Sequence, residues 1–311
     1  MPRQVATSGS RRSAWRKGDA GPSQAAAVRD RMLQHIDAAA VRLRPRRRIT
    51  DEDVHEARKS IKRARAALRL LQPALAANEM ARSRVSLRDA GRALASVRDA
   101  KVMADRFSEM LRRTGIDEFA VSTIASAASS SNSPAARRSA RTRSNPAAAR
   151  AGLTNARRWL SDATLTADGW LPLAEGIRAI YKSGRRDLPT DASAASSEAL
   201  HEWRKRVKNY WHALEVLVEP KRPAYVRQTI NSARRLADAL GEEHDLALLA
   251  EALRASQQSE DERVTILLEA IRLRRRRLRR RALRTGSKLY AETPGAMVRQ
   301  LRPRLPPRGR A

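Results

Sequence analysis

The chain carries the same eight-residue pattern twice. Residues 55–62 read HEARKSIK and residues 201–208 read HEWRKRVK, so the second copy follows the first by 146 positions. The same offset pairs residues outside the motif: Leu68 with Leu214, Arg88 with Arg234, and Leu94 with Leu240. A shift that persists over this length indicates that one module has been duplicated. The fold must therefore accommodate two related halves, each presenting a histidine followed by three cations.

The charge balance of the 311 residues indicates a negatively charged partner. Lys and Arg number 64 against 33 Asp and Glu, which gives a formal charge of +31. Self-repulsion of this size destabilises a compact state unless anions bind, so we expect a polyanion. Cysteine is absent, which excludes disulfides, thiolate metal sites and a cysteine nucleophile. No stretch approaches the roughly 18 to 20 apolar residues of a membrane span, and we expect a cytoplasmic protein.

The composition favours an all-α fold. Aromatic residues make up 4% of the chain, while Ala, Leu and Arg are abundant. Thr50 precedes three acidic residues and predicts the capped start of a helix. Apolar residues at three- and four-residue steps predict helices over 23–43, from Asp51 to Pro73, 81–111, 148–162, 173–186, from Leu200 to Pro220, 225–255, and a last one through 271–281.

Shifts in composition suggest the division of the chain. We expect a basic disordered tail at 1–24, an N-terminal helical bundle at 25–165, a C-terminal bundle at 166–300 and an unstructured tail at 301–311. Residues 126–147 are rich in Ser, Ala, Asn, Pro and Arg without apolar periodicity, which predicts a loop inside the first bundle.

Each motif helix has an apolar stripe and a cationic stripe. At 100° per residue, Arg58, Lys59, Lys62 and Arg69 lie within about 60° of His55. A run of charge on a helix is usually a solvated face, but its recurrence at matched positions favours ligand binding. Arg88 and Arg234, a further matched pair, either line a ligand-binding groove together with these cations or pair with acidic side chains. The arginines of 272–281 are equally compatible with a second anion-contacting surface and with a solvated face.

The doubled His-x-x-Arg-Lys-x-x-Lys motif resembles the CHAD family, the conserved histidine α-helical domain. Further similarity lies at residues 94–99, 240–245, 181–186 and 288–290. The resemblance implies that 25–300 form one CHAD domain of two antiparallel four-helix bundles, related by pseudo-twofold symmetry, whose basic stripes face a shared groove. Three positions depart from the family pattern, and the first is Ala64, which stands where a leucine is usual and concerns local packing. Trp211 replaces an expected cation, which His212 compensates only in part, and His244 replaces a more typical Asn.

The resemblance also implies binding of inorganic polyphosphate, without catalysis, at polyphosphate granules. The candidate binding residues are His55, Arg58, Lys59, Lys62, Arg63, Arg69, Arg88, Lys182, Arg185, His201, Arg204, Lys205, Lys208, His212 and Arg234. We expect no metal and no cofactor, because cations crowd both histidines and neither sits in metal-ligand spacing. No base and orienting acid accompany a nucleophile, so we expect no enzyme.

A nucleic-acid-binding or nucleoid-associated protein is the main alternative, since the charge alone would suit it. A polyphosphate-dependent hydrolase is a third reading, for which the sequence offers no acid–base pair. Oligomeric state, preferred chain length, recruited proteins, the role of the tails and whether His244 contacts ligand are left open by the sequence.

Overall fold

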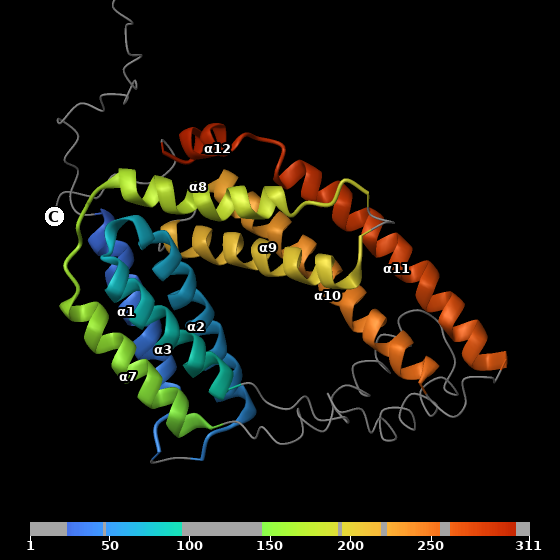
Figure 1. The fold of residues 1–311 in the computed structure, drawn as a ribbon, viewed down its shortest axis with the longest axis horizontal. Coiled ribbons are helices and arrows are strands. Elements are labelled where there is room, and N and C mark those ends of the chain that lie inside the picture. Colours follow the sequence, from blue (N-terminus) through green and yellow to red (C-terminus); the bar gives the residue numbers. More distant parts are fainter. Residues whose placement is uncertain are drawn as a thin grey trace, which may run out of the picture.

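The structure is a computed structural model, and it describes residues 24–45, 48–94, 145–191, 195–218, 223–255 and 262–302. All regular secondary structure in these ranges is helical (Figure 1). The predicted all-α class is confirmed. The pseudo-twofold relation between two bundles, and the division of the chain near residue 165, stay predictions. The tails expected at 1–24 and 301–311 lie almost wholly outside the described residues, and residues 95–99 of the family-like segment 94–99 lie outside them as well.

Four helices and a short 3-10 turn make up the first half. They are α1 (Gln24–Arg42), α2 (Asp51–Leu70), η1 (Gln72–Ala74), α3 (Ala77–Ala93) and α7 (Pro146–Asp162). Helix α1 packs against α2 and α7, while α3 packs against α7 and α2, so the four helices surround one core (Figure 1). Ile36, Ile61, Leu87 and Leu153 are buried there, one from each helix.

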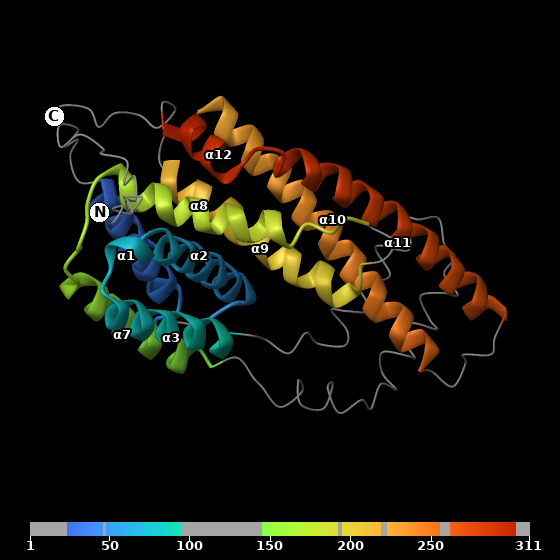
Figure 2. The same cartoon turned by 45° about the horizontal axis from the view of Figure 1, so that its top comes forward.

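The second half contains α8 (Trp170–Arg186), α9 (Ser197–Val218), α10 (Ala224–Arg254), α11 (Glu262–Leu289) and α12 (Pro294–Leu301). Helix α9 packs against α8 and α10, and α12 packs on α8. Helices α10 and α11 run side by side and extend beyond the other helices (Figures 1 and 2). Their outer ends share a separate apolar core that includes Leu246, Leu253, Val264 and Ile271.

The two motif helices, α2 and α9, pack directly against each other and join the halves. A single apolar core runs through both halves, with Ala66 and Leu70 of α2 and Ala213 and Val216 of α9 all buried in it. Helix α8 also touches the end of α2, where a Cβ on Gly176 would lie 2.2 Å from the backbone oxygen of Leu70. The fold thereby places the two copies of the motif next to each other.

The predicted start of α2 is confirmed, because Thr50 and Asp53 form a capping box. The amide of Asp53 donates to Thr50 Oγ1 at 3.2 Å, and the amide of Thr50 donates to Asp53 Oδ2 at 3.1 Å. This arrangement satisfies two amides that the helix itself leaves free.

Other boundaries were predicted less well. Helix α3 begins at Ala77, four residues before the expected 81, and the expected end at 111 lies outside the described residues. Helix α7 begins at Pro146, inside the segment predicted as a loop. Proline suits the first turn of a helix, and Asn145 Oδ1 caps it by accepting from the amide of Ala148 at 2.9 Å. Helix α8 begins at Trp170, after Gly169 turns the chain with φ of 76°.

Candidate polyanion-binding site

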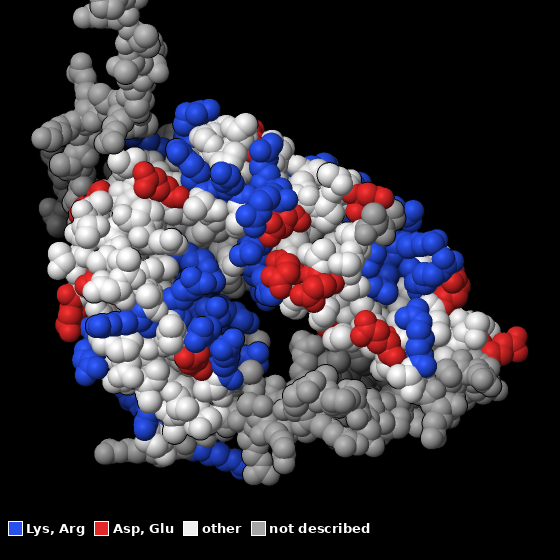
Figure 3. Space-filling view, viewed as in Figure 1, with Lys and Arg blue, Asp and Glu red and all other residues white. Residues whose placement is uncertain are grey.

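Cations from both motifs converge between α2 and α9. Burial and, after it, the charges of Lys62, Arg204 and Arg58 together lower the pKa of Lys208 to about 8, although the charge of Asp238 opposes this shift. Burial and the charges of Arg58, Arg204 and Arg65 also lower the pKa of Lys62. Each lysine therefore lies within electrostatic range of the arginines of both halves. Lys and Arg side chains crowd the face over α2 and α3 and continue toward α8 and α9 (Figure 3).

We call these eight matched residues the cationic seam. They are His55, Arg58, Lys59, Lys62, His201, Arg204, Lys205 and Lys208. Lys59 and Lys205 form its outer part, and each pairs with the glutamate three residues earlier on its own helix: Glu56 at 2.7 Å from Lys59, and Glu202 beside Lys205. Exposed pairs of this kind stabilise a helix by only about 0.3–0.5 kcal/mol, so an incoming anion can replace the carboxylate at little cost.

The two motif histidines lie in different surroundings. His55 is exposed, whereas His201 is half-buried, with its ring centroid 4.5 Å from that of His244 on α10. Burial lowers the pKa of His201, and the charges of His244 and Lys205 add to this effect. The Nδ1 atoms of both His201 and His244 are buried without a hydrogen-bond partner. Sequence reasoning left the role of His244 open, and the structure places it directly beside the motif histidine.

Arg204 lies over α10 at Gly241. Its Nε donates to the backbone oxygen of Ala237 at 3.0 Å, and a Cβ on Gly241 would stand 2.8 Å from one of its terminal nitrogens. The family-like segment 240–245 therefore needs a glycine at Gly241, because any side chain there would displace the guanidinium of Arg204.

Three other predicted binding residues meet at one buried carboxylate. Glu215 on α9 pairs with Arg63 of α2 at 3.5 Å, with Arg234 of α10, and with His212 Nδ1 at 3.2 Å. Burial alone would raise the pKa of Glu215, but the hydrogen bond and charge of His212, with Arg63 and Arg234, lower it to about 2. These residues thus hold α2, α9 and α10 together, a role of Glu215 that no pattern in the sequence predicted.

Trp211, which stands where the family pattern expects a cation, contacts two cations. Lys208 Nζ lies 5.7 Å from a ring centroid of Trp211, and the guanidinium carbon of Arg234 lies 5.3 Å away. Cation–π contacts of this geometry stabilise by roughly 0.5–2 kcal/mol. The indole of Trp211 therefore adds no charge to the seam but helps to position Lys208.

The remaining predicted residues lie at some remove from the seam. Arg69 lines a cavity formed with α3, α8 and α9. Arg88 is exposed and pairs with Asp89 at 2.9 Å. Arg185 donates to the backbone oxygen of Tyr290, near the end of α11, at 3.1 Å, and Lys182 is exposed on α8.

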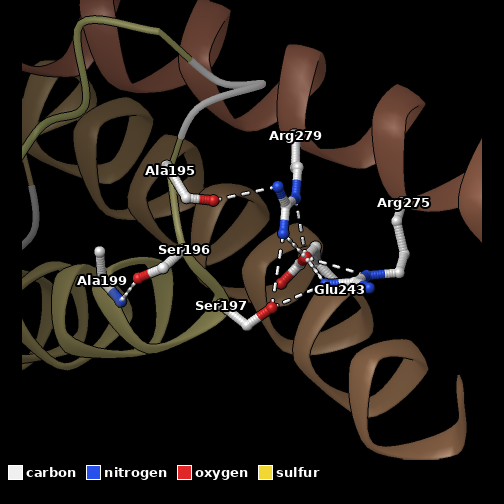
Figure 4. A network of polar contacts seen from close by, with 7 residues as sticks. All are labelled: Ala195, Ser196, Ser197, Ala199, Glu243, Arg275 and Arg279. Carbon is white, nitrogen blue, oxygen red and sulfur yellow. Dashed lines mark hydrogen bonds and ion pairs between the residues drawn. The ribbon is translucent and has the colours of Figure 1, made fainter. Parts of the chain in front are cut away.

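The arginines of α11 include a structural clamp, which neither reading of the 272–281 run anticipated. Arg275 and Arg279 both pair with the buried Glu243 of α10, at 2.9 and 2.8 Å. Arg275 also donates to Ser197 Oγ, and Arg279 to the backbone oxygen of Ala195 (Figure 4). The clamp fastens α11 to α10 and to the start of α9, so part of the run is neither solvated nor available to an anion.

Neither a metal cluster nor a membrane span emerges from the described ranges. No three His, Asp or Glu side chains gather there as a set of metal ligands. None of the described helices combines the length and apolar character needed to cross a bilayer.

Comparison with known proteins places the chain in a family and supports its fold. The CHAD domain model matches residues 24–254, and the chain belongs to the CHAD family. The match ends with α10, so α11 and α12 lie beyond it. A solved structure, PptA from Streptomyces chartreusis, superposes with a TM-score of 0.63 over 87% of this chain and 100% of that chain. At 15% sequence identity the likeness concerns the fold alone. No curated protein matched the chain.

Proposed function

We propose that the chain binds inorganic polyphosphate, without catalysis, in a groove along the cationic seam. The convergence of Lys62 and Lys208 with Arg58 and Arg204 supports this proposal, because four cations from two halves share one place. Such an arrangement is electrostatically unfavourable by itself. A bound polyanion would relieve it and raise the pKa of both lysines.

Polyphosphate suits this site better than a ligand with fixed shape. It is a flexible chain with about one negative charge per phosphate and no base edges to read. Arginine offers paired donors that match phosphate oxygens, and lysine offers a compact mobile charge. The seam repeats both at the spacing of a helix, so successive phosphates would meet successive cations.

We further propose that the protein acts in the cytoplasm at polyphosphate granules. The seam uses only part of the +31 charge, so further basic surface is available to contact other chains of a granule. Self-repulsion between protein molecules would fall as the polymer neutralises them.

Nucleic acid is the alternative ligand, and competition separates the two. Labelled long-chain polyphosphate bound to the protein at physiological salt is titrated with duplex DNA or RNA at matched phosphate concentration. We expect the polyphosphate to resist displacement. Displacement at equal charge would favour the nucleic-acid reading. In either case counterion release should make affinity fall by several powers of ten between about 50 and 200 mM salt if about ten cations engage.

A further inference from the structure

A second concentration of positive charge lies outside the cationic seam, in a cavity of about 250 Å³ between α2, α3, α8 and α9. Four arginines line it, together with three polar side chains and an apolar wall. The arginines are Arg65 and Arg69 of α2, Arg84 of α3 and Arg206 of α9, and the polar residues are Gln72, Ser183 and Asn209.

These arginines are poorly compensated. Burial and the charges of Arg65, Arg84 and Arg206 lower the pKa of Arg69 to about 10. Its guanidinium donates to the backbone oxygen of Arg65 at 3.2 Å. Within the described ranges no carboxylate pairs with Arg65, Arg69 or Arg84, and Arg206 alone reaches one, Asp187, at 3.1 Å. The cavity thus concentrates positive charge where the protein supplies little negative charge.

The second half has a carboxylate at the position where the first half has Arg69. At the 146-residue offset, Arg69 corresponds to Glu215 and Arg88 corresponds to Arg234. Glu215 is buried and its two oxygens bind arginines from α2 and α10. At the matched position the first half carries an arginine where the second half carries this carboxylate, so the first half has a cation in place of an anion there.

We propose that this cavity binds a phosphate group that carries two negative charges, as a chain end or pyrophosphate does. An internal phosphate carries about one negative charge, and the polymer chain extends from it on both sides, so an open groove suits it. A terminal phosphate carries more negative charge, and the chain extends from it on one side only, so a cavity suits it. Several guanidinium groups can donate in pairs to its free oxygens. The proposal rests on the proposed function only in that a chain end as the source of this phosphate requires polyphosphate binding.

The test uses the full-length protein and pyrophosphate as the probe, measured by calorimetric titration. We expect one pyrophosphate per chain, and we expect Arg69→Glu to weaken it at least tenfold, because the new carboxylate would occupy the place of the anion. Arg158→Glu on the exposed face of α7 makes the same charge change away from the cavity and should bind like the parent. If Arg69→Glu binds pyrophosphate as tightly as Arg158→Glu does, the proposal is wrong.

Two further arms separate this proposal from the proposed function. The double variant Arg58→Glu with Arg204→Glu should lose long-chain polyphosphate yet keep pyrophosphate. Short chains, which have more ends per phosphate, should lose more affinity than long chains on Arg69→Glu. Equal losses would exclude a chain end as the source and leave free pyrophosphate. Should Arg69→Glu not fold, Arg84→Gln, at an exposed position, must weaken pyrophosphate at least threefold for the proposal to stand.

Discussion

The two halves of the molecule share a sequence register but differ in how they balance charge. In the second half Glu215 pairs with Arg234 and also with Arg63 of the first half, and Glu243 pairs with Arg275 and Arg279. In the first half the position of Glu215 holds Arg69, which faces other arginines. The comparison teaches that two copies of a duplicated helix can share the His-x-x-Arg-Lys-x-x-Lys motif while their other positions differ in charge. At this position the second-half helix carries a carboxylate that joins three helices, and the first-half helix carries an arginine among other arginines.

The largest loss of polyphosphate affinity should come from mutating the cationic seam, which both halves contribute to. Reversing one seam arginine on each helix, in Arg58→Glu with Arg204→Glu, should weaken polyphosphate binding at least tenfold, because two charge-assisted contacts become repulsive. Filter binding or calorimetry measures the affinity, and circular dichroism should show unchanged helicity. The pair Arg158→Glu with Arg299→Glu makes the same charge change at exposed positions and controls for net charge. Unchanged affinity in the seam variant would mean that the ligand binds elsewhere.

Neutralising the matched positions 69 and 215 should change stability in opposite directions. Glu215→Gln leaves Arg63, Arg234 and His212 without their carboxylate and should cost about 2 kcal/mol of unfolding free energy, less than the roughly 3–5 of a fully buried pair because both arginines are partly exposed. Arg69→Gln should stabilise by up to about 1 kcal/mol, because it relieves repulsion. Urea unfolding measures both. A destabilising Arg69→Gln would contradict the contrast between the halves.

Affinity should depend on pH through Lys208. In the free protein this lysine keeps its proton only below about pH 8, and a bound polyanion raises its pKa. Affinity should therefore be greatest below pH 8 and fall by up to about tenfold per unit as the pH rises above it. Lys208→Arg keeps its charge throughout and should remove this decline. A parent protein whose affinity is flat from pH 7 to 10 would show that Lys208 does not meet the ligand.

The smallest effect should come from Gly241→Ala. The added methyl would stand 2.8 Å from the Arg204 guanidinium and push it aside, and we expect a two- to threefold loss of polyphosphate affinity, of the order of 0.5 kcal/mol. Alanine favours a helix over glycine by about 1 kcal/mol, so unfolding stability should not fall. A fall in stability with unchanged affinity would assign Gly241 to packing alone.

The all-α fold could be predicted because helical periodicity is a local pattern, whereas the proximity of the two motif helices was expected only from the resemblance to the CHAD family. The capping box at Thr50 and Asp53 is written in adjacent residues. Helix starts that depend on proline or glycine were predicted less well, since Pro146 opens a helix in a segment that looked like a loop.

Residues that recur in both halves could be singled out from the sequence as candidates for the site, whereas the contacts of residues that differ between the halves could not be predicted. Glu215 stands at the position that matches Arg69 and carries the opposite charge, so the repeat did not indicate that Glu215 pairs with three cationic side chains. Arg65, Arg84 and Arg206 come from three helices and meet only through tertiary packing. Comparing charges position by position at the 146-residue offset would have exposed the exchange at 69 and 215.

Lysine protection by the ligand tests the central claim most directly. The protein is acetylated at pH 8 with and without long-chain polyphosphate, and modification at each lysine is measured by mass spectrometry. Lys208, with a pKa of about 8, should react readily when free. The account predicts that polyphosphate protects Lys62 and Lys208 together while exposed Lys288 on α11 reacts as before. Unchanged reactivity of Lys62 and Lys208 in the presence of bound polyphosphate would contradict it.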